Sequence, residues 1–258
     1  MLLIGDVRMD DNERMSQRDP DDADRAACAA DLVRYLNEAR ELRRAAAADA
    51  VFGARRHALR AFQAARLSRT HADLLASPAS AEAASFFLAD LYGPKDLSER
   101  DAEVERILPM MTSMLPVSGL QTLLLAVEVD ALSERLDAAM VRALGRKLDG
   151  DIDDASYARA YRKVGERTAR LDQIRLIGET GAALDALARR PLLRGLLKMM
   201  HGPAQMAGLG ELHAFLFRGF EAFRSLADAE AFLDTIVSRE GALALVIFDG
   251  SDTLASTG

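Results

Sequence analysis

The feature that most constrains the fold is a stripe of large apolar side chains within residues 117–148. Its members recur at steps of four, three, four, four and three residues: Leu125, Val129, Leu132, Leu136, Met140 and Ala143. This spacing follows the 3.6-residue turn of an α-helix and does not follow the two-residue alternation of a strand. A helix with one apolar face must bury that face against other elements, so we expect a protein built from packed helices.

Most of the remaining chain shows the same helical pattern. We expect helices at residues 31–50, 80–92, 157–189, 191–200, 204–226 and 229–240, and another that carries Phe52, Leu59 and Phe62. The β-like run 242–248 is short and could equally be a final helical turn. The sequence therefore predicts an all-α fold, a single bundle-like domain of about eight to ten helices. We expect close helix approaches at Gly178 and Gly181.

The two ends of the chain are expected to be flexible. Residues 1–25 contain eight acidic and four basic side chains and few large apolar ones, which cannot compensate the entropy of ordering. Met15 is therefore an alternative start to Met1. We assign residues 1–25 to an N-terminal arm, residues 26–248 to the helical domain and residues 249–258 to a C-terminal tail.

Composition and charge disfavour several classes of protein. The formal net charge of −7 argues against general affinity for nucleic acids or anionic membranes. Cys28 is the only cysteine, so an internal disulfide and a multi-cysteine metal site are excluded. The N-terminus lacks the apolar core of a signal peptide, and no window is apolar enough to span a bilayer. We expect a cytoplasmic protein without a bound cofactor.

One candidate polar site centres on Glu128, which follows a wholly apolar run on the longest predicted helix. Burial raises the pKa of a carboxyl group or requires a cation beside it. Arg170, with Gln173 close to it in sequence, is the partner that we expect. An ion pair that fixes the register of two helices is the preferred interpretation, and a catalytic group is the alternative.

A second candidate site is an apolar groove rich in methionine. Flexible thioethers suit adaptable surfaces that bind ligands or partners, although gap-filling in an ordinary core explains such residues equally well. The side chains assigned to the groove are Met110, Met114, Met199, Met200, Met206 and Phe220. The expected occupant is an apolar small molecule or a protein partner, and a homodimer is one form that this binding could take.

Other candidate motifs lack the spacing that their chemistry needs. The acidic run 149–154 lacks the glycine and the glutamate of an EF-hand, so we interpret it as a solvated turn that caps the next helix. The four histidines, His57, His71, His201 and His213, are scattered in sequence. Surface or edge positions are expected for them, and the alternative for one of them is an axial haem ligand. Residues 40–69 hold eight arginines against two acids, but no aromatic platform or reading motif accompanies them.

The segment Ser85-Phe-Phe-Leu-Ala-Asp-Leu-Tyr-Gly-Pro94 resembles the signature of a family of uncharacterised bacterial proteins. The likeness continues through Ser98-Glu-Arg-Asp101 to Pro109, and weaker matches extend it over roughly residues 55–245. Glu128, Arg170 and Gly219 lie among these later matches. The resemblance implies a helical domain of unknown function, and it implies no catalytic residues.

These observations lead to one leading hypothesis and two alternatives. The leading hypothesis is a non-catalytic binding module for an apolar small molecule or a protein partner. The first alternative is an enzyme or haem-type cofactor protein that uses Glu128, Arg170 and a histidine. The second is a nucleic-acid-associated regulator that uses the arginine-rich segment.

Overall fold

The computed structural model describes residues 20–87, 103–104, 106–108, 112 and 117–254. In these residues the chain forms ten α-helices and one 3₁₀ helix, and no strand is present. The predicted all-α fold is therefore confirmed. Met110, Met114 and most of the family-like signature, from residue 88 onward, lie outside the described residues.

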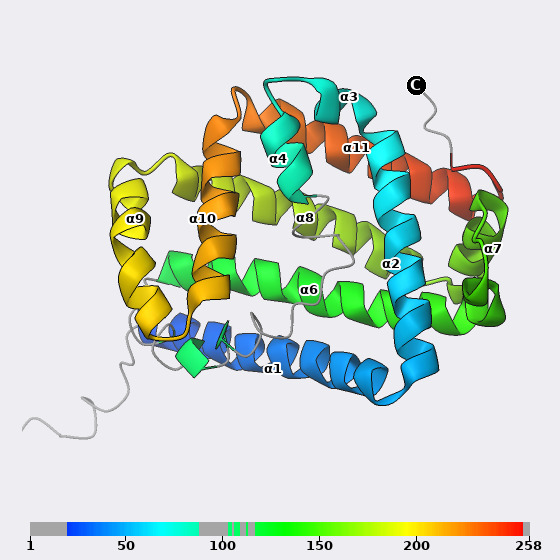
Figure 1. Ribbon diagram of the computed structural model, residues 1–258, viewed down its shortest axis with the longest axis horizontal. Helices are drawn as coiled ribbons and strands as arrows, with labels where there is room; N and C mark the ends of the chain where they lie inside the picture. The colour runs from blue at the N-terminus through cyan, green and yellow to red at the C-terminus, as the bar shows by residue number, and fades with distance from the viewer. Residues whose placement is uncertain (1–19, 88–102, 105, 109–111, 113–116, 255–258) are drawn as a thin grey trace, which may run out of the picture.

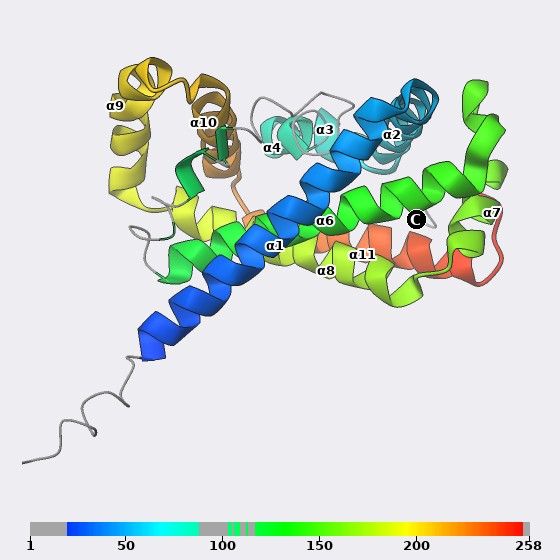
Figure 2. The same cartoon turned by 90° about the horizontal axis from the view of Figure 1, so that it is seen from below.

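The helices form two layers (Figures 1 and 2). In the first layer α6, α8 and α11 lie side by side, and α1 packs along α6. In the second layer α2, α4 and α10 cross over one face of the first, with α3 beside α4. The bounds of these helices are α1 (Pro20–Ala48), α2 (Ala50–Thr70), α3 (Ala72–Ala76), α4 (Ala81–Phe86), α6 (Val117–Leu144), α8 (Arg167–Ala188), α10 (Gly210–Ser225) and α11 (Ala229–Phe248).

Three short or peripheral helices complete the arrangement. The 3₁₀ helix η2 (Gly145–Asp149) extends α6, and α7 (Asp154–Val164) packs against α6 and α11. At the opposite end of the molecule, α9 (Pro191–Met206) packs against α10 and α8 (Figure 1). The acidic run 149–154 is a turn that caps α7, as predicted: the Asp153 carboxylate accepts a hydrogen bond from the backbone N–H of Ser156 at 2.6 Å.

Several helix boundaries differ from the sequence-based prediction. The first helix, α1, begins at Pro20 and not at residue 31, so residues 20–25 of the predicted flexible arm are helical. The single helix predicted for residues 157–189 is wrong, because Gly165 and Glu166 adopt positive φ angles of 73° and 51° and separate α7 from α8. The predicted end at Met200 is also wrong, since α9 continues through Pro203 to Met206 and ends before Gly208, whose φ is 66°. The β-like run 242–248 is the last part of α11.

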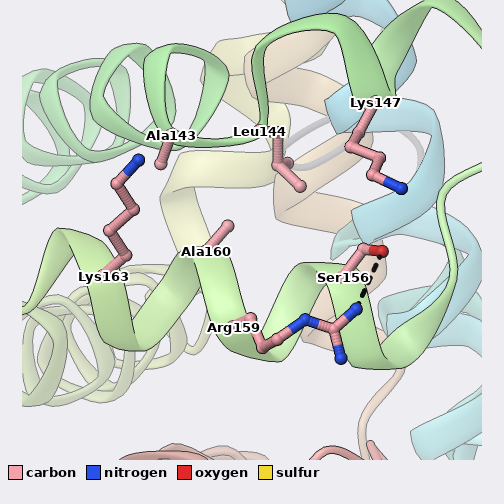
Figure 3. A pocket seen from close by; sticks show the side chains of 7 residues that line it. All are labelled: Ala143, Leu144, Lys147, Ser156, Arg159, Ala160 and Lys163. Carbon is pink, nitrogen blue, oxygen red and sulfur yellow. Dashed lines mark hydrogen bonds between the residues drawn. The ribbon is translucent and has the colours of Figure 1, made fainter.

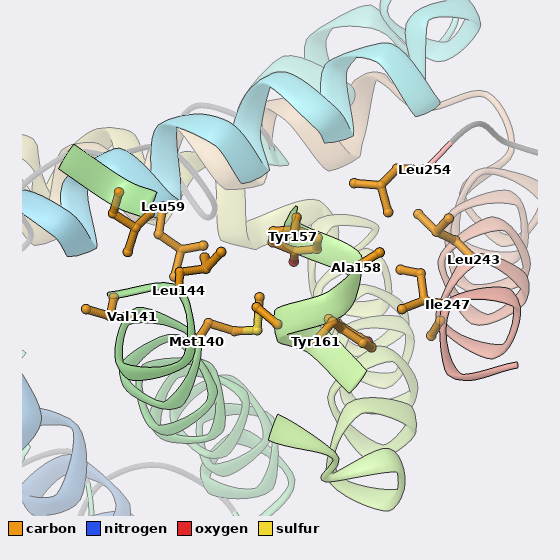
Figure 4. Close-up of a cluster of buried hydrophobic side chains, with 13 residues drawn as sticks. Leu59, Met140, Val141, Leu144, Tyr157, Ala158, Tyr161, Leu243, Ile247 and Leu254 are labelled. Carbon is orange, nitrogen blue, oxygen red and sulfur yellow. The ribbon is translucent and has the colours of Figure 1, made fainter. Parts of the chain in front are cut away.

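The largest apolar cluster lies where α2, α6, α7 and α11 meet (Figure 4). Met140 and Val141 of α6 pack there with Tyr157 of α7 and Ile247 of α11. Leu254, which we placed in a flexible tail, belongs to the same cluster and is only 4% exposed. Burial of one leucine side chain contributes about 1.5–3 kcal/mol, which helps to hold residues 249–254 against the domain.

Two glycines bring α8 close to α11, as the sequence predicts. A Cβ atom at Gly181 would lie 2.4 Å from a methyl group of Leu233, and one at Gly178 would lie 2.8 Å from a methyl group of Val237. Such distances are shorter than van der Waals contact, so a side chain at either position of α8 would clash with a side chain of α11.

Candidate functional site

A buried carboxylate with three arginine partners lies where α1, α2 and α6 meet. Glu134 of α6 is 1% exposed. Arg43 of α1 donates to its carboxylate at 3.0 Å, and Arg56 and Arg60 of α2 donate to it at 2.5 and 2.6 Å. A single acidic side chain of α6 therefore joins α1 and α2 to that helix.

Two more acidic side chains of α6 complete this cluster, which we call the Glu134 cluster. Asp130 accepts two hydrogen bonds from Arg43, at 2.6 and 2.7 Å. Asp137 accepts from Arg60 at 3.2 Å and from Gln63 at 3.0 Å. The three acids stand at positions i, i+4 and i+7, on one face of α6. Three positive charges meet three negative charges, so the cluster is neutral as a whole.

A second buried network lies between α2 and α11. Glu240 accepts hydrogen bonds from Nη1 of Arg66 at 2.5 Å, and its Oε1 lies 3.0 Å from Nε2 of His71. Arg66 and His71 are 9% and 4% exposed. We call this the Glu240 network. The sequence predicted a surface position for His71, which is wrong because the end of α2 is covered by α11.

Opposing effects set the charge state of both buried carboxylates. Burial of Glu134 disfavours its charged form, but Arg60, Arg43 and Arg56 together outweigh that effect and lower its pKa below the usual 4.5. Burial of Glu240 is likewise outweighed by Arg66 and His71, so its pKa is also lowered. Both groups are therefore ionised at neutral pH.

Stability is expected to decrease as the pH falls below about 4.5. A carboxyl group whose pKa is lower in the folded state stabilises the fold above its unfolded pKa, and this contribution is lost as the pH falls through its folded pKa. Denaturant unfolding from pH 7 to pH 3 measures the effect. In Glu134→Gln and Glu240→Gln variants the slope in this range should be smaller, and an unchanged slope in both would contradict the assignment.

The structure brings together only part of the polar cluster that the sequence predicted from Glu128, Arg170 and Gln173. Arg170 is buried, its Nη1 donates to Gln173 at 3.2 Å, and Gln173 donates to Ser133 of α6 at 2.8 Å. The guanidinium also lies 4.6 Å from the ring centre of Tyr161. Glu128 is half-buried elsewhere on α6, where it accepts a hydrogen bond from the Tyr35 hydroxyl at 2.9 Å.

The Glu128–Arg170 ion pair that the sequence suggested is therefore not formed. Tyr35, on α1, occupies the position beside Glu128 because α1 packs along that face of α6. Arg170 instead stabilises contact between α8, α7 and α6 through Gln173 and Tyr161. Glu128 and Arg170 are therefore held by hydrogen bonds to different helices.

The positive charge of the arginine-rich segment 40–69 is largely neutralised by carboxylates of the same chain. Six of its eight arginines form ion pairs with carboxylates on other segments: Arg43, Arg55, Arg56, Arg60, Arg66 and Arg69. The segment therefore does not present its local charge of +6 as an unpaired basic surface. This arrangement weakens the interpretation of the segment as a phosphate-binding face.

The histidines form one further pair. His213 of α10 is 9% exposed, its Nε2 lies 2.8 Å from the carbonyl oxygen of Leu197, and its ring centre lies 5.3 Å from that of His201. The surface position expected for His213 is therefore wrong, because α9 covers it. Within the described part of the chain, no group of three or more histidine, cysteine or acidic side chains is arranged to hold a metal ion.

A shallow recess lies between the end of α6 and α7 (Figure 3). It has a volume of about 180 Å³, and Lys147, Arg159 and Lys163 stand at its rim. Arg159 donates to the Ser156 hydroxyl at 3.4 Å and pairs with Asp252 at 3.1 Å. The side chains lining the recess provide positive charge and one hydroxyl, and no carboxylate or imidazole is among them.

The outer side of α9 exposes a set of large apolar side chains. We call it the α9 face, and it consists of Leu192, Leu196, Met199, Met200 and Met206. Leu192, Met199 and Met206 are 87%, 71% and 85% exposed. Half of the ten exposed large apolar side chains of the described residues lie on this one helix. Leu193 and Leu197, on the inner side, pack against the core.

The predicted groove is corrected in one respect. Met199, Met200 and Met206 share the α9 face, but Phe220 is 8% exposed and lies in the core cluster formed with Phe223 and Phe232. Phe220 was placed in the groove because α10 carries a wide apolar stripe. That stripe is covered by α4, α8 and α11 in the fold, so Phe220 stabilises the core instead.

Comparison with known proteins identifies a family. A family model described as a domain of unknown function (DUF8198) matches residues 42–254. No curated protein and no solved structure matches the chain significantly. None of the described helices is long and apolar enough to cross a bilayer.

Proposed function

The chain belongs to the DUF8198 family, and we propose that it is a non-catalytic helical module that binds a protein partner through the α9 face. The observation that carries the proposal is the exposure of Leu192, Met199 and Met206 on one helix. Contiguous apolar side chains on a protein surface mark sites of interaction more often than singly scattered ones do. The cell interior is the location in which we expect this binding.

The two sides of α9 have separate roles in this proposal. Leu193 and Leu197 already attach the helix to the core, and Ala204 is buried with them on the inner side. The α9 face is therefore not needed to fix the helix to the domain. Methionine supports this role, since an unbranched, polarizable side chain adapts to the shape of a partner.

The buried charges support a non-catalytic role. Glu134 and Glu240 have their hydrogen-bonding capacity directed to arginines and a histidine of the same chain. Glu134 is 1% exposed between α1, α2 and α6, so a substrate could reach its carboxylate only after these helices separate. We therefore interpret both networks as devices that fix the relative positions of helices.

A triple substitution of the α9 face is expected to abolish partner binding without unfolding the protein. The test uses Leu192→Ser, Met199→Ser and Met206→Ser together, and a 16-residue amphipathic helical peptide with leucine on one face and glutamine on the other. Fluorescence anisotropy should show binding to the parent chain, and the triple variant should bind at least about tenfold more weakly. Each substitution is on the surface and should change stability by at most about 0.5 kcal/mol.

The control variant carries Val33→Ser, Val51→Ser and Leu245→Ser, which removes three exposed apolar side chains outside α9. This variant should bind the peptide as the parent does. Absence of peptide binding by the parent chain, or equal weakening in both triple variants, would show that the α9 face is not a binding surface.

A further inference from the structure

The charge around α9 indicates what kind of partner fits it. Between Asp185 and Glu211 the chain contains no acidic residue and four basic ones, Arg189, Arg190, Arg194 and Lys198. Arg189 is paired with Asp185 and Arg194 with Glu221. Arg190 and Lys198 are exposed and have no ion-pair partner among the described residues. A partner that covers the α9 face therefore meets two uncompensated positive charges.

The backbone of α9 also favours a helical partner. Gly195, Met199, Gly202 and Met206 follow one another at steps of four, three and four residues, so they share one side of the helix. A Cβ atom at either glycine would meet nothing within 4 Å. Glycine inside a helix costs about 1 kcal/mol relative to alanine, and nothing within the described chain requires it at these two positions.

We infer that the α9 face binds an amphipathic helix of a partner protein whose polar positions are acidic, and this inference rests on the proposed function. Gly195 and Gly202, which lie one turn before Met199 and one turn before Met206, let the partner backbone approach α9 closely. Acidic side chains beside the partner's apolar stripe would pair with Lys198 and Arg190. Complementary charge of this kind contributes to specificity and to the rate of association.

Two other occupants fit the same surface less well. A second copy of the chain, packed antiparallel through α9, would place Lys198 of each copy near the other, where like charges repel. An anionic membrane would meet a helix with two unpaired cations and no aromatic side chain, on a protein of net charge −7. A protein helix with acidic positions is compatible with the exposed methionines, the glycines and the two cations together.

The test compares two helical peptides that share one leucine face, one with glutamate and one with lysine at the polar positions. The parent chain should bind the glutamate peptide about three- to tenfold more tightly at low salt, and the difference should shrink as salt is added. Arg190→Glu combined with Lys198→Glu should reverse the preference. Arg44→Glu with Lys147→Glu, two exposed cations away from α9, changes net charge equally and should keep it.

A backbone variant gives an independent measurement. Gly195→Ala with Gly202→Ala should raise the thermal midpoint, because alanine favours the helix, and should weaken binding of the glutamate peptide several-fold. A variant that is more stable than the parent but binds the glutamate peptide as tightly would contradict a close approach of the partner backbone to α9.

The remaining outcomes separate the inference from the proposed function. Equal binding of both peptides would overturn the acidic partner and leave the α9 face as a binding surface, whereas binding of neither would overturn both proposals. A dimer in sedimentation experiments that the α9 triple substitution dissociates would identify a second copy as the occupant. Binding to vesicles of phosphatidylserine but to no peptide would identify a membrane. Either result would overturn the inference.

Discussion

Replacing Glu134 with alanine is expected to lower the free energy of unfolding by about 3–5 kcal/mol, because it leaves three guanidinium groups without their common counter-charge. Arg43, Arg56 and Arg60 are each at most 20% exposed, so water compensates them poorly. Urea unfolding followed by circular dichroism at 222 nm measures the change. Because the cluster joins α1 and α2 to α6, we also expect faster amide exchange in α1.

Two further variants show whether charge and burial cause this loss. Glu134→Gln keeps the size of the side chain and removes its charge, so the loss should be large but smaller than for alanine. Asp149→Asn breaks an ion pair with Arg55 in which the carboxylate is exposed. Its effect should be much smaller, because exposed pairs are screened by water and salt. Similar losses in Glu134→Ala and Asp149→Asn would contradict the role assigned to the Glu134 cluster.

Helical periodicity was sufficient to predict the fold class. The stripe from Leu125 to Ala143 lies within α6, and the glycines of α8 pack against α11 as expected. The break between α7 and α8 was missed, because Arg162-Lys-Val-Gly-Glu166 carries no proline and a single glycine is common inside predicted helices. Only the positive φ of both Gly165 and Glu166 reveals that the chain turns there.

The buried charges were harder to predict than the helices. Glu128 was chosen because it follows an apolar run, but the buried acids of α6 are Glu134 and Asp137, and Glu134 is the more deeply buried. Its partners are 74 to 91 residues distant in sequence, and helical periodicity does not say which helices lie side by side. One signal was present: Asp130, Glu134 and Asp137 stand at i, i+4 and i+7, so they share a second face of the helix that carries the apolar stripe.

The sequence predicted only part of the surface proposed for binding. The sequence placed Met199, Met200 and Met206 in one groove, and all three are exposed on α9. It did not distinguish the two sides of the helix, because Leu192, Leu193, Leu196 and Leu197 are identical in type. Packing of the inner side against the core decides which leucines remain exposed to a partner. This packing depends on which helices lie beside α9, and the sequence of α9 does not show that.

The Glu240 network yields the second large effect that we expect. Glu240→Ala leaves the buried guanidinium of Arg66 without its carboxylate and removes the hydrogen-bond partner of His71, so the free energy of unfolding should fall by about 3–5 kcal/mol. Removing both charges should lower the free energy of unfolding by less, because burying an ion pair also requires the desolvation of both ions. The double variant Arg66→Met with Glu240→Leu tests this point against each single substitution.

A double-mutant cycle measured by urea unfolding separates the pair from its surroundings. We expect the double variant to be more stable than Glu240→Leu alone, since Arg66→Met removes the buried charge that Glu240→Leu leaves uncompensated. His71 stays in place in every variant, so the difference reports the Arg66–Glu240 interaction. Additive losses would mean that the two residues act independently and would contradict the role assigned to the pair.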